Sequence, residues 1–123
     1  MIHFYQYVDL NLGGVADDDT VEGLPPFGVV QSSGDGWVSE TADTPAVDRY
    51  EVGLVPAILD KLNDGGPDDL TNVGGPMVGD VCWAFQWDVE LNPGGSFLLS
   101  KDKHLVIPEP ATLGLLLVGG LMA

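Results

Sequence analysis

Residues 81–91 read VCWAFQWDVEL and carry the clearest structural signal in this chain. Large apolar side chains occupy every second position, and smaller or polar side chains occupy the positions between them. Side chains of a β-strand alternate between its two faces, so a period of two is typical of a long strand with one buried face. We therefore predict a strand that directs one set of residues at the core: Val81, Trp83, Phe85, Trp87, Val89 and Leu91.

Residues 2–12 show a second alternating pattern. One set of side chains is predicted to face the core: Ile2, Phe4, Val8, Leu10 and Leu12. The other set is predicted to face outward: His3, Tyr5, Tyr7, Asp9 and Asn11. The turn residues Asn-Pro-Gly-Gly at 92–95 predict that the strand over 81–91 folds back into residues 96–100 as a hairpin. Shorter strands are predicted over 27–31, 36–41, 49–54 and 104–107.

One segment departs from this alternation. Residues 56–63 place apolar side chains on one face of a short helix, with Pro56 in its first turn and two glycines, Gly65 and Gly66, after its end. Short antiparallel strands separated by turns rich in Gly, Pro and Asp are typical of a β-sandwich or jelly roll. We predict a mainly β fold: an antiparallel β-sandwich or jelly-roll-like domain over residues 1–105, with one short helix at about 56–63.

The composition narrows the class of protein. There are 19 Asp and Glu residues against 4 Lys and Arg, which gives a formal net charge of −15. A nucleic-acid-binding surface needs positive charge opposite phosphate, so we expect no nucleic-acid partner. The hydrophobic fraction of 45% argues against disorder. The single cysteine allows no internal disulfide, so the fold must depend on its apolar core.

The C-terminal residues 106–123 read VIPEPATLGLLLVGGLMA. Pro108, Glu109 and Pro110 form a stiff box, because proline fixes its own φ and restricts the residue before it. The residues after the box carry no charge, and we predict that they form a hydrophobic helical tail, part of a transmembrane segment: Leu113, Leu115, Leu116, Leu117, Val118 and Leu121. Such a box and tail indicate a sorting or processing segment; a short buried element of a soluble protein is the alternative.

The run from Val106 to Leu113 resembles the PEP-CTERM sorting signal of Gram-negative bacteria that make exopolysaccharide. The resemblance, with the apolar tail, covers 18 of the 123 residues, 106–123. It implies that Pro108, Glu109 and Pro110 are recognised, and the signal cleaved, by an exosortase, a membrane peptidase with a cysteine nucleophile. It also implies that the protein is exported, is anchored in the membrane through its tail before processing, and then resides at the cell surface or in the extracellular matrix. Exopolysaccharide is a further partner that the resemblance suggests.

The chain departs from that pattern at both ends. The signal in the family has a full transmembrane helix and then an arginine-rich cluster, whereas here 13 residues, 111–123, follow the box and none is basic. As a helix they would reach about 20 Å, and a bilayer core of about 30 Å needs about 20 residues. Residues after Met1 lack the pattern of a secretory signal peptide. We therefore expect a sequence truncated at its C-terminus and lacking its signal peptide, which leaves open an N-terminally incomplete β domain.

No catalytic motif emerges from the residues, so we predict a protein that is not an enzyme. His3 and His104 are the only histidines, and neither has a ligand partner three or four residues away. We interpret both as solvent-facing residues and Cys82 as a small strand residue. A Cys82–His104 dyad stays open, although no motif supports it.

Calcium is the one cofactor that the sequence makes a candidate. Hard cations prefer carboxylate and carbonyl oxygens, which loops rich in Asp and Gly can supply. Two acidic segments qualify, but Leu62 occupies a ligand position of the EF-hand template, so the alternative is that both are solvated turns. The candidate ligands are Asp17, Asp18, Asp19, Asp64, Asp68 and Asp69.

Tryptophan and tyrosine side chains raise the possibility of a carbohydrate platform. Trp83 and Trp87 share the apolar face of residues 81–91, so we assign them to the core. The candidate ligand-binding residues are Trp37 with Tyr5 or Tyr7. Two hypotheses follow. The first is a non-enzymatic surface or matrix protein delivered by the sorting signal. The second is a secreted carbohydrate- or calcium-binding module, either on its own or as part of a carbohydrate-active protein.

Overall fold

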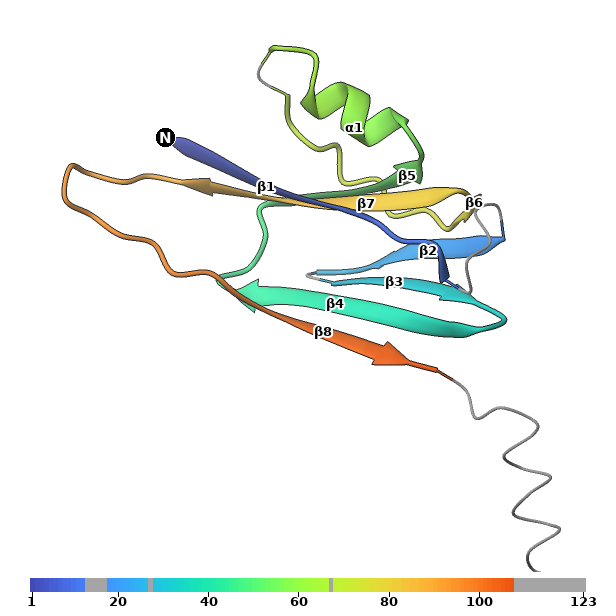
Figure 1. Ribbon diagram of the computed structural model, residues 1–123. Coiled ribbons are helices and arrows are strands. Elements are labelled where there is room, and N and C mark those ends of the chain that lie inside the picture. Colours follow the sequence, from blue (N-terminus) through green and yellow to red (C-terminus); the bar gives the residue numbers. More distant parts are fainter. Residues whose placement is uncertain (13–17, 27, 67, 108–123) are drawn as a thin grey trace, which may run out of the picture.

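A computed structural model describes residues 1–12, 18–26, 28–66 and 68–107 of the chain. The fold is mainly β, with antiparallel strands in two sheets and one short helix (Figure 1). The order of strands is β1-β7-β5 in the three-stranded sheet and β6-β2-β3-β4-β8 in the five-stranded sheet. The elements are β1 (Ile2–Asp9), β2 (Asp19–Leu24), β3 (Gly28–Ser33), β4 (Gly36–Thr44), β5 (Arg49–Leu54), α1 (Ala57–Leu62), β6 (Met77–Gly79), β7 (Val81–Val89) and β8 (Ser100–Val106).

The two sheets face each other across an apolar core. From β7, Trp83, Phe85 and Trp87 enter this core and are at most 1% exposed. The rings of Phe85 and Trp87 meet edge to face with centroids 6.0 Å apart. Valines of the facing sheet complete the layer, among them Val21, Val29 and Val38. The predicted β-sandwich character and the aromatic core face of residues 81–91 are therefore confirmed.

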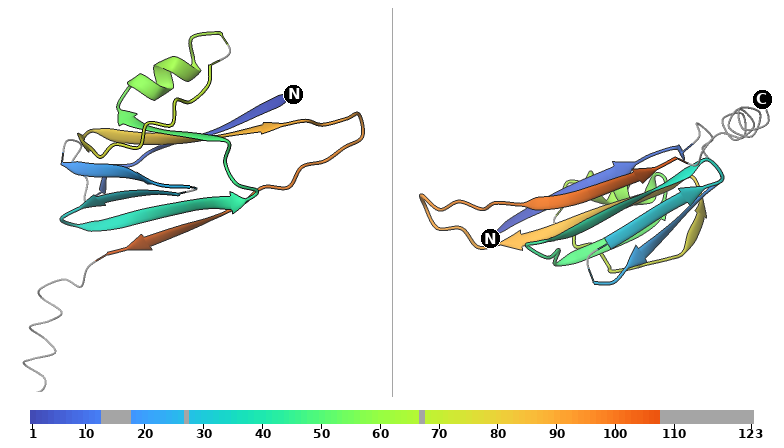
Figure 2. Two further views of the ribbon diagram at one scale, coloured as in Figure 1. Left: turned by 180° about the vertical axis from the view of Figure 1, so that it is seen from behind. Right: turned by 90° about the horizontal axis from the view of Figure 1, so that it is seen from below.

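The second face of β7 is also buried, which the alternation did not predict. Cys82, Ala84 and Gln86 have no exposed surface. A second apolar cluster lies on this face, where Ile58 of α1 and Leu70 pack over Cys82 and Ala84. Figure 2 shows α1 on the side of the three-stranded sheet that faces away from the five-stranded sheet. The helix prediction is confirmed within one residue at each end.

The predicted hairpin between residues 81–91 and 96–100 is wrong. The turn exists, since Gly95 donates its backbone N–H to the carbonyl of Asn92 at 2.8 Å. Beyond it the chain crosses to the other sheet, where β8 pairs with β4 and Val106 lies opposite Trp37. The reason is that both edges of β7 are already occupied, by β1 and by β5.

The other observed strands agree only in part with the ranges predicted from the sequence. The range 49–54 is reproduced, β3 and β4 extend beyond their predicted ends, and β8 begins four residues before its predicted start. Two strands were not predicted, β2 and β6, which pair with each other. The sequence of β2, DTVEGL, contains two acids and a glycine, and these residues have low strand propensity.

The exposure of β1 differs from its predicted pattern. Phe4 does contact Trp87, with ring centroids 5.9 Å apart, but Ile2 and Phe4 are about half exposed because they lie on an edge strand. Tyr5 and Tyr7, predicted to face outward, are partly buried against the second apolar cluster. The strand ends at Asp9 rather than at residue 12.

The predicted sorting box and tail lie outside the described residues: Pro108, Glu109, Pro110, Leu113, Leu115, Leu116, Leu117, Val118 and Leu121. The helical tail therefore stays a prediction. Within the described part of the chain, no helix is both long and apolar enough to cross a membrane.

Truncation of Phe85 tests the importance of the core. Phe85→Ala should lower the free energy of unfolding by about 3–5 kcal/mol, because it removes a fully buried ring and leaves a cavity between the sheets. Leu98→Ala is the matched control, since Leu98 is 85% exposed, and should change stability by less than about 0.5 kcal/mol. Urea unfolding of both variants measures the difference. Equal stabilities would contradict the assignment of Phe85 to the core.

Candidate functional site

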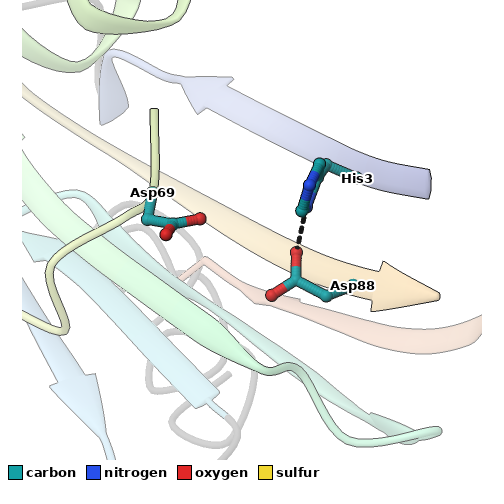
Figure 3. Close-up of side chains that lie close together, drawn as sticks. All are labelled: His3, Asp69 and Asp88. Atoms are coloured by element: carbon teal, nitrogen blue, oxygen red, sulfur yellow. Dashed lines mark hydrogen bonds and ion pairs between the residues drawn. The ribbon is translucent and has the colours of Figure 1, made fainter. Parts of the chain in front are cut away.

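Three side chains from three segments of the chain meet at one end of the three-stranded sheet. They are His3 of β1, Asp88 of β7 and Asp69 of the segment that follows α1, and one ligand atom of each lies within 4.8 Å of the others. Figure 3 shows the imidazole and the two carboxylates directed toward one another. The structure thus contains a His/Asp/Asp cluster of the type that can hold a metal ion.

The pairing of β1 with β7 brings His3 and Asp88 together. These two residues are cross-strand partners in the antiparallel register, so their side chains emerge side by side on the same face. Nδ1 of His3 lies 2.6 Å from Oδ1 of Asp88. The face is the outer one, shared with Tyr5 and Gln86, at the end of the sheet away from β6.

Gln86 holds the two carboxylates in position. Its side chain is fully buried, and Nε2 donates to Asp69 Oδ1 and to Asp88 Oδ1, both at 2.8 Å. Its Oε1 accepts the backbone N–H of Leu70 at 2.8 Å. Because both ends of this amide are hydrogen-bonded, its orientation is determined, and it fixes the positions of the two acids.

A buried acid, Glu51, holds the Asp69 segment on the sheet. Glu51 Oε1 accepts hydrogen bonds from Lys61 Nζ of α1 at 2.7 Å and from the backbone N–H and hydroxyl of Thr71 at 2.9 and 2.7 Å. Tyr5 also donates its hydroxyl to the backbone carbonyl of Asp68. These contacts anchor the helix and the segment on both sides of Asp69.

The site has a strong excess of negative charge. Asp48 adds a third carboxylate, whose Oδ2 accepts the backbone N–H of Asp88 at 2.6 Å. The nearest cation is Arg49, 3.9 Å from Asp69, and this pair is largely exposed. Burial alone would raise the pKa of Asp88, but hydrogen bonds from Gln86 and His3 outweigh it and lower that pKa. Burial, and then the charges of Asp69 and Asp88, raises the pKa of the Tyr5 hydroxyl.

An open pocket of about 190 Å³ lies beside the cluster. It is lined by His3, Tyr5, Leu62, Gly66 and Asp68. Because His3 belongs both to the pocket and to the cluster, a small solute can reach the imidazole from solvent.

The predicted calcium ligands divide between two places. Asp64, Asp68 and Asp69 lie in the segment after α1, whereas Asp18 and Asp19 lie at the start of β2 in the other sheet, and Asp17 is outside the described residues. Asp19 is 1% exposed, and its Oδ2 accepts hydrogen bonds from Gln31 Nε2 at 2.5 Å and from the backbone N–H of Leu12 at 3.0 Å. Asp19 therefore has an internal structural role rather than that of a surface loop acid.

The predicted aromatic platform is not formed. Trp37 lies on the outer face of the five-stranded sheet, where its ring meets that of His104 with centroids 5.0 Å apart. Tyr5 and Tyr7 lie on the outer face of the other sheet, against the second apolar cluster. The core between the two sheets separates them, so Trp37 and the tyrosines cannot contact one ligand together.

The Cys82–His104 dyad is likewise not formed. Cys82 is fully buried beneath α1, and its thiol donates to the carbonyl of Gly53 at 3.7 Å, while His104 belongs to β8 of the other sheet. Burial raises the pKa of the Cys82 thiol, which disfavours the reactive thiolate. The interpretation of Cys82 as a small strand residue agrees with this environment.

Sequence reasoning did not bring His3, Asp69 and Asp88 together. His3 is 43% exposed, in agreement with a surface position, but it has Asp88 as a partner 85 residues away in the sequence. The alternating patterns over 2–12 and 81–91 do place both residues on the polar side of their strands. The sequence patterns do not show the register that aligns these two residues, because the register depends on how the two strands pair.

Comparison of the chain with known protein families, with curated proteins and with solved structures gives no match. The chemistry of the site must therefore be inferred from its own atoms: one imidazole, two carboxylates and a buried amide that orients them. Imidazole and carboxylate groups can share protons with one another or bind a divalent cation together.

Acid titration tests how Glu51 supports the site. Burial would raise the pKa of Glu51, but hydrogen bonds from Lys61 and Thr71 outweigh it and lower that pKa below its ordinary value of 4.5. The stabilisation by Glu51 is therefore complete above pH 4.5 and is lost as the pH falls through the lowered pKa of the folded state. Glu51→Gln should lower the free energy of unfolding at pH 7 by about 2 kcal/mol.

The difference between wild type and Glu51→Gln should shrink as the pH is lowered from 7 toward 3, as measured by urea unfolding at each pH. Glu22→Gln, at an exposed position of β2, is the control. A difference that stays constant over this range would contradict the assigned role of the Glu51 carboxylate.

Proposed function

We propose that this chain is a non-enzymatic exported protein whose acidic β domain is presented at the cell surface or in the extracellular matrix. An exosortase-type peptidase recognises the Pro108–Pro110 box and cleaves the signal, and the apolar tail anchors the protein in the membrane until then. The single observation that carries the proposal is the box itself, followed directly by an uncharged apolar run.

The described fold is compatible with a removable segment after it. The last strand, β8, ends at Val106, and the next residue, Ile107, is 72% exposed. Among the described residues, both sheets and both apolar clusters are built from residues that precede the box. Cleavage near the box would leave every described strand in the released domain.

The charge of the chain supports the same proposal. A formal net charge of −15 favours solubility and repulsion between copies, which suits a protein released from the membrane. The four basic residues are each within 4.0 Å of a carboxylate: Arg49 of Asp69, Lys61 of Glu51, and Lys101 and Lys103 of Glu40. Exopolysaccharide remains part of the proposal as the surrounding matrix.

A substitution in the box tests processing. In cells that contain an exosortase, Glu109→Gln should leave the chain in the membrane fraction at its unprocessed mass, because the acidic residue of the box is lost. The same effect should follow from deletion of the exosortase gene. Immunoblotting of membrane and medium fractions, with intact-mass measurement of the released domain, gives the readout.

Glu90→Gln is the matched control, since it removes an exposed acid just beyond the end of β7. This variant should be processed like the wild type. Normal release of Glu109→Gln, or release that does not depend on exosortase, would contradict the proposed sorting.

Calcium binding by the segment after α1 is the second candidate function. The observation that favours it is that Asp64 and Asp68 lie four residues apart in the segment after α1, where Oδ2 of Asp68 is buried and has no hydrogen-bond partner. Interaction with the Asp64 carboxyl group, followed by burial, raises the pKa of Asp68. Two carboxyl groups whose charges disfavour each other in this way can bind a hard cation together.

A calcium titration followed by melting temperature tests this candidate. Ca²⁺ should raise the melting temperature of the wild type by a few degrees and leave that of Asp64→Asn unchanged, because the variant loses one charged oxygen ligand. Asp60→Asn, an exposed position of α1, is the control and should respond like the wild type. An unchanged melting temperature in the wild type would rule out the calcium role.

A further inference from the structure

We propose that His3, Asp69 and Asp88 form a binding site for a divalent transition-metal ion, represented experimentally by Zn²⁺. The ion would replace the proton between Nδ1 of His3 and Oδ1 of Asp88, with Asp69 as the third protein ligand and water completing the coordination. This inference goes beyond the proposed sorting function and does not depend on it.

The donor set indicates the class of metal. Imidazole nitrogen is a ligand for zinc, copper, iron and nickel, whereas calcium and magnesium prefer oxygen donors alone. Three protein ligands with ligand atoms within 4.8 Å of one another match the number in metal sites that keep a position for water. One nitrogen and two carboxylates therefore favour a first-row transition metal over calcium.

The basic residues of the protein do not neutralise the carboxylates of the cluster. All four basic residues already lie beside carboxylates, and the only one near the cluster, Arg49, is 3.9 Å from Asp69 in a largely exposed pair. Asp88 and Asp69 are nevertheless held close to each other by one buried amide nitrogen. Two adjacent carboxylates repel, and a bound divalent ion would turn this repulsion into attraction.

The surroundings of the cluster resemble the support that metal ligands receive. Gln86 is fully buried and hydrogen-bonds both carboxylates, as the outer partners of metal ligands do. Asp48 accepts the backbone N–H of Asp88, which fixes the backbone at this ligand. The pocket beside His3 and Tyr5 gives an ion access from solvent.

Metal binding would join three segments that are far apart in the sequence. His3 belongs to the edge strand β1, Asp88 to the central strand β7, and Asp69 to the segment that covers the outer face of the sheet. An ion that binds the folded but not the unfolded chain raises stability by mass action. The site would therefore secure β1 and the covering segment against β7.

Zinc titration of the untagged full chain tests the proposal. Isothermal titration calorimetry at pH 7.5 should show one Zn²⁺ bound per chain, and the melting temperature should rise with Zn²⁺ concentration. His3→Gln and Asp88→Asn should each weaken binding by at least about tenfold, the lower end of the effect of losing even an outer partner of a metal ligand. Both side chains are partly exposed, at 43% and 24%, so neither change removes a core residue.

The chain offers matched controls on β8. His104→Gln removes the only other histidine, and Asp102→Asn removes an exposed acid of the same strand. Both variants should bind Zn²⁺ like the wild type. With two histidines in the chain, the ring-nitrogen resonances can be assigned by NMR, and Zn²⁺ should shift those of His3 alone, whereas equal Ca²⁺ or Mg²⁺ should not.

Three results would overturn the proposal. One is the absence of Zn²⁺ binding by the wild type. Another is equal weakening in His104→Gln and His3→Gln, which would indicate binding without a built site. The third is a shift of the His3 ring resonances by Ca²⁺ as large as that by Zn²⁺. None of these results bears on processing at Glu109, so the two proposals can fail separately.

Discussion

The central place of β7 is the constraint on which the rest of the structure depends. Its two edges are hydrogen-bonded to β1 and β5, and both of its faces are buried, one by aromatic packing between the sheets and one beneath α1 and the segment after it. Because neither edge is free, the chain that leaves β7 must pair elsewhere, and β8 joins β4 in the other sheet. The same constraint places His3 opposite Asp88, since β1 has one register on β7 that puts Phe4 and Val8 against Trp87 and Trp83.

The outer face of β7 and β5 carries two buried polar side chains beneath its covering layer, Gln86 and Glu51, and the partners of both hold this layer in place. Gln86 bonds the backbone of Leu70 and the side chains of Asp69 and Asp88. Glu51 bonds Lys61 and Thr71. A buried polar group without partners would cost free energy, so these residues specify where the covering segment lies. The His/Asp/Asp cluster results from this packing, because Asp69 reaches the sheet only while its segment is held there.

Much of the fold could be predicted, and the failures have definite physical causes. The strand over 81–91, the strand over 49–54 and the helix near 56–63 carry strong local patterns and were found. β2 was missed because its acids and glycine have low strand propensity, and pairing with β3 and β6 overrides this preference. The prediction of a platform formed by Trp37 with Tyr5 or Tyr7 was wrong. Alternation shows which face of a strand a residue occupies, but it does not show which sheet the strand joins. Of the cluster, only Asp69 was a candidate, since a metal site assembled from strands has no local spacing to reveal it.

The sequence by itself determined the mainly β class, the aromatic face of residues 81–91, the strong negative charge and the Pro-Glu-Pro box with its apolar run, because each of these is a property of consecutive residues. The tertiary structure alone decided that β8 crosses to the second sheet, that Cys82 and Gln86 are buried, and that His3 lies 2.6 Å from Asp88. These outcomes depend on strand order and register. Both are set by how buried surfaces fit together across the whole domain, and contacts between residues 85 positions apart leave no periodic trace in the sequence.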